Sequence, residues 1–82
     1  MTGYYLMKVR KILETSAPGL GQKIKSAREN DKRSLLQICQ EVGMTPTNWY
    51  KIEAEETKYL PLETLVAIEE VLKVDFGVTF PD

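Results

Sequence analysis

Histidine is absent from the 82-residue sequence, and cysteine occurs once, as Cys39. A single cysteine excludes an intrachain disulfide, and a zinc site without histidine would need an improbable set of ligands. The sequence also lacks a glycine-rich phosphate loop and a credible nucleophile with a base. We therefore expect no metal, no cofactor and no enzymatic activity. Cys39 is expected to be a small buried packing residue rather than a redox sensor.

Long apolar runs are missing from the sequence as well. No stretch reaches the roughly 18 apolar residues that mark a candidate membrane-spanning helix. At the N-terminus, Tyr4 and Tyr5 precede Lys8, Arg10 and Lys11, which is not the order of a secretion signal. The sequence thus predicts a cytoplasmic protein that has no membrane partner.

The chain length predicts a single domain over residues 1–82. Within it, we expect an N-terminal strand and linker over residues 1–17, a helical core over residues 20–74 and a C-terminal strand or tail over residues 75–82. A chain this short buries a limited fraction of its surface, so a second copy of the chain would add stability.

Charge is distributed unevenly along the chain, although its net value is only −1. Residues 1–33 hold eight basic and three acidic side chains, whereas the remainder holds three basic and nine acidic ones. Between residues 33 and 52 the only carboxylate is that of Glu41, so a surface there can be locally positive. The alternative is a set of ordinary solvated helix faces, which predicts that any binding of DNA depends weakly on salt.

Two short helices joined by a tight turn are predicted over residues 34–53. Ser34 is an N-cap residue type, and Gly43 can adopt the left-handed conformation that ends a helix. Thr45 can cap the second helix, with Pro46 in its first turn. The apolar residues of both helices recur at helical spacing: Ile38, Cys39, Val42, Trp49 and Ile52.

The flanking segments predict two more helices and two strands. A helix is expected over Leu20–Asn30, and another from about Pro61 to about Lys73. Partial alternation over Tyr4–Leu13 and a period of two over Asp75–Phe80 predict strands. Antiparallel pairing of these strands would form a small sheet. Its exposed edge would pair with a second copy to form a homodimer, or the sheet would be an internal ribbon of a monomer.

The segment over residues 34–53 resembles the helix-turn-helix of the phage-repressor and Cro-type family, also called xenobiotic-response-element-like (XRE) regulators. Cys39 stands where the family has a small residue, and Gly43 stands at the turn. Three more residues match the family's core positions: Met44, Trp49 and Ile52. Leu20–Asn30 resembles the family's first helix, and Leu62–Leu65 the start of its fourth. The resemblance implies a mainly α, lambda-repressor-like domain of about four helices.

This resemblance also implies a function, which is sequence-specific binding of double-stranded DNA to regulate transcription. The second helix of the motif, at about residues 45–53, would enter the major groove with its outward residues: Thr45, Pro46, Thr47, Asn48, Tyr50 and Lys51. Asn48 suits adenine, Thr47 suits thymine, and Lys51 suits guanine or phosphate. Phosphate contacts are expected from three side chains: Arg33, Ser34 and Tyr50.

Several of these residues have a second interpretation. Thr45 can serve as a helix cap alone, and Asn48 can be a solvated polar residue. Trp49 can stack on single-stranded bases, although its helical phase indicates a core residue. The resemblance further suggests a structural ion pair between Arg28 and Glu53, neither of which would then contact DNA.

The sequence departs from the family pattern at a few positions. Leu35 replaces a glutamine that bonds a phosphate, and Glu55 and Glu56 stand where glycine and lysine are frequent and would repel a nearby DNA backbone. A short tail replaces the usual fifth helix. These departures favour an alternative, a protein-interaction module on the same scaffold without DNA binding. An antitoxin-type autorepressor with a protein partner is a further possibility within the regulator class.

Overall fold

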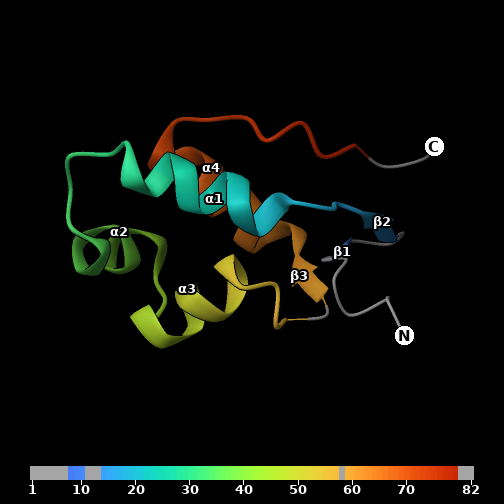
Figure 1. Cartoon of the computed structure of the whole chain (residues 1–82), viewed down its shortest axis with the longest axis horizontal. Helices are drawn as coiled ribbons and strands as arrows, with labels where there is room; N and C mark the ends of the chain where they lie inside the picture. Colours follow the sequence, from blue (N-terminus) through green and yellow to red (C-terminus); the bar gives the residue numbers. More distant parts are fainter. Residues whose placement is uncertain (1–7, 11–13, 58, 80–82) are drawn as a thin grey trace.

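The computed structural model describes residues 8–10, 14–57 and 59–79 of the chain, and this part is mainly helical (Figure 1). Its elements follow in the order β1 (Lys8–Arg10), β2 (Glu14–Ser16), α1 (Leu20–Glu29), α2 (Leu35–Val42), α3 (Pro46–Glu53), β3 (Tyr59–Pro61) and α4 (Leu62–Leu72). All four predicted helices are present, and each begins and ends within about one residue of the predicted position. None of the helices in the described ranges is long and apolar enough to cross a membrane.

The predicted caps determine where α2 and α3 begin and end. The hydroxyl oxygens of Ser34 and Thr45 each accept a hydrogen bond from the backbone N–H three residues later, at 3.1 and 3.2 Å. Pro46 occupies the first turn of α3, where no backbone donor is lost. Gly43 ends α2 with φ +93°, a left-handed conformation that costs a glycine little. The tight turn between the two helices is therefore specified by local sequence.

The core lies between the four helices and the sheet. It is formed by buried side chains from every described helix, from β1 and β3, and from the segment between β2 and α1: Val9, Ala17, Leu20, Ile24, Ile38, Cys39, Trp49, Ile52, Leu60, Leu65, Ile68 and Leu72. Trp49 is fully buried, so its core assignment is confirmed. Cys39 is buried too, and burial raises the pKa of its thiol, as expected of a packing residue rather than a reactive one.

Gly21 allows α1 to approach α3 closely. A Cβ atom at this position would lie 2.3 Å from the backbone oxygen of Glu53, far inside van der Waals contact. The Gly21 N–H, near the start of α1, donates a hydrogen bond to Oε2 of Glu55 at 3.0 Å. No side chain at the N-cap position Gly19 satisfies this end of α1, so the carboxylate of Glu55 acts as its cap from a distant part of the chain.

The sheet is small and differs from the prediction. β1 is its central strand, paired antiparallel with β2 and parallel with β3. The described part of the predicted strand over Tyr4–Leu13 is thus extended, but β2 and β3 were not predicted. Leu60 lies beside Val9 in the register and both are buried, so packing against the helices places β3 next to β1.

The predicted C-terminal strand is not present in the described residues 75–79, and its predicted pairing with the N-terminal strand is not observed there; Phe80 lies outside them. Local hydrogen bonds explain the difference. The N–H of Phe76 donates to Oε2 of Glu69 on α4 at 3.0 Å, and the N–H of Gly77 donates to Oδ1 of Asp75 at 2.8 Å. Gly77 has φ +74°, which interrupts an extended strand. The segment instead runs past α1 and α4 (Figure 1), with Phe76 and Val78 packed on the core.

The close approach at Gly21 leads to a stability prediction. Gly21→Ala should lower the free energy of unfolding by roughly 1 to 3 kcal/mol, because the added methyl group forces α1 away from α3. Ser26→Ala, at an exposed position of the same helix, should leave stability unchanged or raise it slightly. Urea denaturation followed by circular dichroism measures both changes. Equal stability of Gly21→Ala and wild type would show that the two helices do not depend on this contact.

Candidate nucleic-acid interface

The second helix of the turn, α3, has one buried side and one outward side. Trp49 and Ile52 are 0% and 2% exposed and hold the helix in the core. The residues predicted to enter the major groove, called the reading residues below, lie on the other side. Thr45, Thr47, Asn48, Tyr50 and Lys51 are exposed, and Pro46 is partly buried. Tyr50 is the aromatic residue among them, and 54% of its surface is exposed. The structure thus brings these predicted residues together on one surface.

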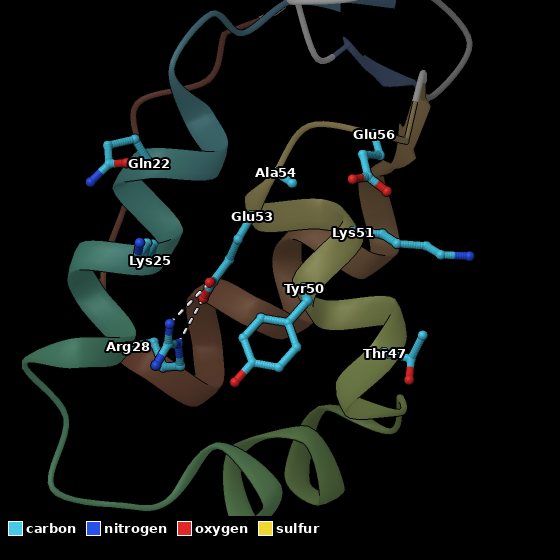
Figure 2. Close-up of a pocket in the computed structure, with 9 residues that line it drawn as sticks. All are labelled: Gln22, Lys25, Arg28, Thr47, Tyr50, Lys51, Glu53, Ala54 and Glu56. Atoms are coloured by element: carbon cyan, nitrogen blue, oxygen red, sulfur yellow. Dashed lines mark hydrogen bonds and ion pairs between the residues drawn. The ribbon is translucent and has the colours of Figure 1, made fainter.

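A groove of about 670 Å³ separates this surface from α1 (Figure 2). The α1 wall carries Gln22, Lys25 and Arg28. The α3 wall and the residues after it carry Thr47, Tyr50, Lys51, Glu53, Ala54 and Glu56. Three of the six reading residues, Thr47, Tyr50 and Lys51, therefore line a hollow. Its second wall belongs to α1, a helix that was not predicted to be part of the site.

Arg28 and Glu53, which both line this groove, form a bidentate ion pair (Figure 2). Nε of Arg28 donates to Oε2 of Glu53 at 2.7 Å, and Nη2 donates to Oε1 at 3.0 Å. The Trp49 indole Nε1–H also donates to Oε2, at 2.6 Å. The hydrogen bond with Glu53 raises the pKa of the Arg28 guanidinium. The predicted structural ion pair is confirmed, and it neutralises both charges.

The ring of Tyr50 lies beside this ion pair (Figure 2). The guanidinium carbon of Arg28 lies 5.9 Å from the centre of the Tyr50 ring, within the range of a cation–π contact. The ring thus has a defined place at the mouth of the groove while remaining more than half exposed. Sequence reasoning assigned the hydroxyl of Tyr50 a phosphate contact but did not predict the ring's contact with α1.

The two carboxylates after α3 have different environments. Glu55 adopts a left-handed conformation, φ +56°, and its N–H donates to the carbonyl of Ile52, while the N–H of Glu56 donates to that of Lys51. This is a Schellman ending, which usually contains glycine. The carboxylate of Glu55 reaches the backbone of Gly21 at the start of α1, where the helix dipole favours negative charge. Glu56 is exposed at the edge of the groove.

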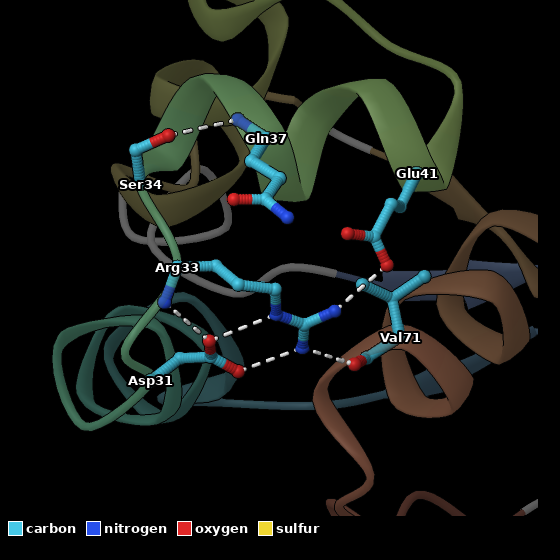
Figure 3. Close-up of polar contacts among 6 residues, drawn as sticks. All are labelled: Asp31, Arg33, Ser34, Gln37, Glu41 and Val71. Carbon is cyan, nitrogen blue, oxygen red and sulfur yellow. Dashed lines mark hydrogen bonds and ion pairs between the residues drawn. The ribbon is translucent and has the colours of Figure 1, made fainter.

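Arg33 lies apart from the groove and has protein partners (Figure 3). Its guanidinium donates to both carboxylate oxygens of Asp31 at 2.9 and 2.7 Å, to Oε1 of Glu41 at 2.8 Å and to the carbonyl of Val71 at 2.6 Å. These bonds connect the α1–α2 loop with α2 and α4. Hydrogen bonds from Arg33 lower the pKa of Asp31 to about 2. The charge that was predicted to meet a phosphate is therefore already balanced by two carboxylates.

The first residues of α2 and the residue before it differ in exposure. The hydroxyl of Ser34 caps α2 and is exposed, as its predicted phosphate contact requires. Leu35 is partly buried and packs on the core, so this position contributes apolar contact where a glutamine would offer a polar group.

Sequence reasoning missed Gln22 and Lys25 as possible site residues. Lys25 precedes Arg28 by three residues, so the two share a face of α1. The expected Arg28–Glu53 pair therefore already implied that Lys25 lies opposite α3. No group of three or more metal-binding side chains occurs within the described ranges.

Loss of the ion pair should destabilise the fold. Arg28→Ala leaves the carboxylate of Glu53, whose side chain is 6% exposed, with the Trp49 indole as its remaining donor. We expect a loss of about 2 kcal/mol, below the roughly 3 to 5 kcal/mol of a fully buried pair because the Arg28 side chain is partly exposed. Arg28→Lys, which keeps the charge but cannot bond both oxygens, should lose less. Thermal melting monitored by Trp49 fluorescence tests this, and unchanged melting of Arg28→Ala would contradict it.

The Arg33 contacts should make stability depend on acid pH. Because folding lowers the pKa of Asp31 from its ordinary 3.8 to about 2, the stabilisation is fully present above about pH 5 and is lost as the pH falls through about 2. Asp31→Asn should be less stable than wild type at pH 6, and the difference should shrink by pH 2. Glu70→Gln, at an exposed position of α4, serves as the control. Urea denaturation at pH 6, 4, 3 and 2 measures the effect, which a constant difference between Asp31→Asn and wild type would refute.

Comparison of the chain with protein-family models, with curated protein sequences and with solved structures finds no significant match.

Proposed function

We propose that this chain is a sequence-specific regulator of transcription that binds double-stranded DNA through α3. One observation carries the proposal: the same short helix has two side chains fixed in the core, Trp49 and Ile52, and an exposed polar flank at its N-terminal half. A helix held in this way can enter the major groove without rearrangement. None of the described residues covers that flank, since its members are exposed.

The flank has the chemistry needed to read base edges. Asn48 offers both a donor and an acceptor for adenine, and Thr47 offers a hydroxyl and a methyl group for thymine. Lys51 extends from α3 away from the Arg28–Glu53 pair (Figure 2) and suits guanine or phosphate.

Because the hydroxyl oxygen of Thr45 accepts the capping bond of α3, we assign this residue a capping role first. Ser34 and Tyr50 remain candidates for phosphate contacts.

The local charge supports an anionic partner better than the net charge of −1 does. Glu53 is paired with Arg28, and the carboxylate of Glu55 caps α1. The groove beside the reading flank is therefore lined by two lysines, Lys25 and Lys51, against the exposed carboxylate of Glu56. Arg33 is not among the proposed phosphate contacts, because Asp31 and Glu41 already neutralise it.

The proposal extends to the class of regulator. The resemblance over α2 and α3 suggests a cytoplasmic protein of the helix-turn-helix class that acts by binding rather than by catalysis. Homodimerisation would present two α3 helices to adjacent major grooves. Both edges of β1 are occupied, by β2 and β3, so a dimer formed through the sheet would use the outer edge of one of those strands. An antitoxin-type autorepressor, controlled by a protein partner, belongs to the same proposal.

A protein-interaction module is the second candidate, and one observation favours it. Leu36 on α2 is 57% exposed, and Leu35 before it offers no polar group at the start of this helix. An exposed leucine at that place suits an apolar partner better than a phosphate backbone. Under this second hypothesis, the chain keeps the helical scaffold but does not bind DNA.

Selection from random duplex DNA followed by a salt titration separates the two candidates. For the regulator we expect one enriched half-site, with affinity that falls steeply as salt rises. Two inverted copies of the half-site would indicate a dimer. Lys51→Ala should weaken binding and reduce the salt slope by about one ion, whereas Lys73→Ala, exposed after α4, should change neither. Absence of any enriched sequence would reject the regulator and favour the interaction module.

A further inference from the structure

The α1 wall of the groove carries a lysine without an assigned role. Lys25 is exposed, lines the groove opposite Tyr50 and Lys51, and forms no ion pair with the described residues (Figure 2). Two arginines close to Lys25 in the sequence already have carboxylate partners, because Arg28 is bound to Glu53 and Arg33 to Asp31 and Glu41. Lys25 is therefore the cation that α1 presents to the hollow beside the reading flank.

We propose that Lys25 holds a backbone phosphate of the duplex read by α3, so that the groove receives the sugar–phosphate backbone of one DNA strand. The proposal rests on the function proposed above and adds a second helix to the DNA-binding surface. It adds Lys25 to the proposed phosphate contacts, from which the ion pairs of Arg33 with Asp31 and Glu41 exclude that arginine.

The composition of the groove fits this occupant. A sugar–phosphate chain alternates anionic phosphates with apolar deoxyribose faces. The groove offers lysines on its two sides, from α1 and from α3, and between them the exposed ring of Tyr50 and the side chain of Ala54. Its lining contains one exposed carboxylate, that of Glu56, against these two lysines. The Tyr50 ring lies beside the Arg28 guanidinium, its centre 5.9 Å from the guanidinium carbon, and a sugar can pack on the exposed part of the ring.

Continuity with the reading flank identifies the source of the backbone. Thr47, Tyr50 and Lys51 belong both to the outward side of α3 and to the wall of the groove. A duplex that rests on α3 therefore brings its own phosphates to the mouth of the groove. A contact from α1, which is fixed to α3 through Arg28 and Gly21, would then set the angle at which α3 lies in the major groove.

Substitution of Lys25 tests the proposal, and Lys23 supplies a matched control. Lys23 is exposed on the same helix but lines the hollows beside Phe76 and the C-terminal segment, away from the groove. Lys25→Ala should weaken binding roughly five- to tenfold at about 0.1 M salt and reduce the slope of log affinity against log salt by about one. Lys23→Ala should change neither quantity. Lys25→Arg should restore both.

The measurement uses the full chain with two probes, the enriched duplex and a mixed-sequence duplex of equal length. A phosphate contact carries no sequence information, so Lys25→Ala should weaken binding to both probes by the same factor. Equal affinities and slopes for Lys25→Ala, Lys23→Ala and wild type would overturn the role of Lys25 while leaving the regulator intact. Wild-type protein that binds neither duplex would overturn both proposals. Circular dichroism verifies that each variant is folded. Lys25→Gln, which removes the charge but keeps a longer side chain than alanine, should weaken binding as Lys25→Ala does.

Discussion

The carboxylate of Glu53 connects the helix that would read DNA to the rest of the molecule. It accepts hydrogen bonds from Arg28 of α1 and from the indole of Trp49, which is fully buried in the core. The backbone carbonyl of the same residue lies against Gly21, where no Cβ atom fits. These contacts fix both the distance and the rotation of α3 relative to α1. The outward flank of α3 is exposed because its opposite side is held in this way.

Charge is arranged around α3 by pairing rather than by composition. The carboxylates of Glu53 and Glu55 are directed at α1, one at a guanidinium and the other at a backbone N–H. Arg33, which is adjacent to α2 in sequence, serves the scaffold by joining Asp31, Glu41 and the carbonyl of Val71. A slightly acidic chain can thus present lysines beside the outward side of α3. The functional proposal depends on this local arrangement, which the net charge does not describe.

Much of the helical scaffold could be predicted because its determinants are local. Ser34, Gly43, Thr45 and Pro46 begin and end α2 and α3 through contacts within a few residues of themselves. Helical spacing identified Trp49 and the other core residues of this segment. The Arg28–Glu53 pair was predicted from a family resemblance, and the geometry confirms it. The outward flank of α3 follows from the same periodicity, since a helix with one side in the core exposes the other.

The sequence by itself therefore determined the four helices, the turn between α2 and α3, and which side of α3 is buried. Tertiary structure decided the rest, because it depends on groups that are distant along the chain. Val9 meets Leu60 only when the helices pack, which places β1 beside β3 rather than beside the C-terminal segment. The hydrogen bond from Phe76 to Glu69 holds that segment along the helices, and two carboxylates bind Arg33. The groove with Lys25 on its second wall exists because Gly21 lets α1 lie against α3, a proximity that no local pattern in the sequence encodes.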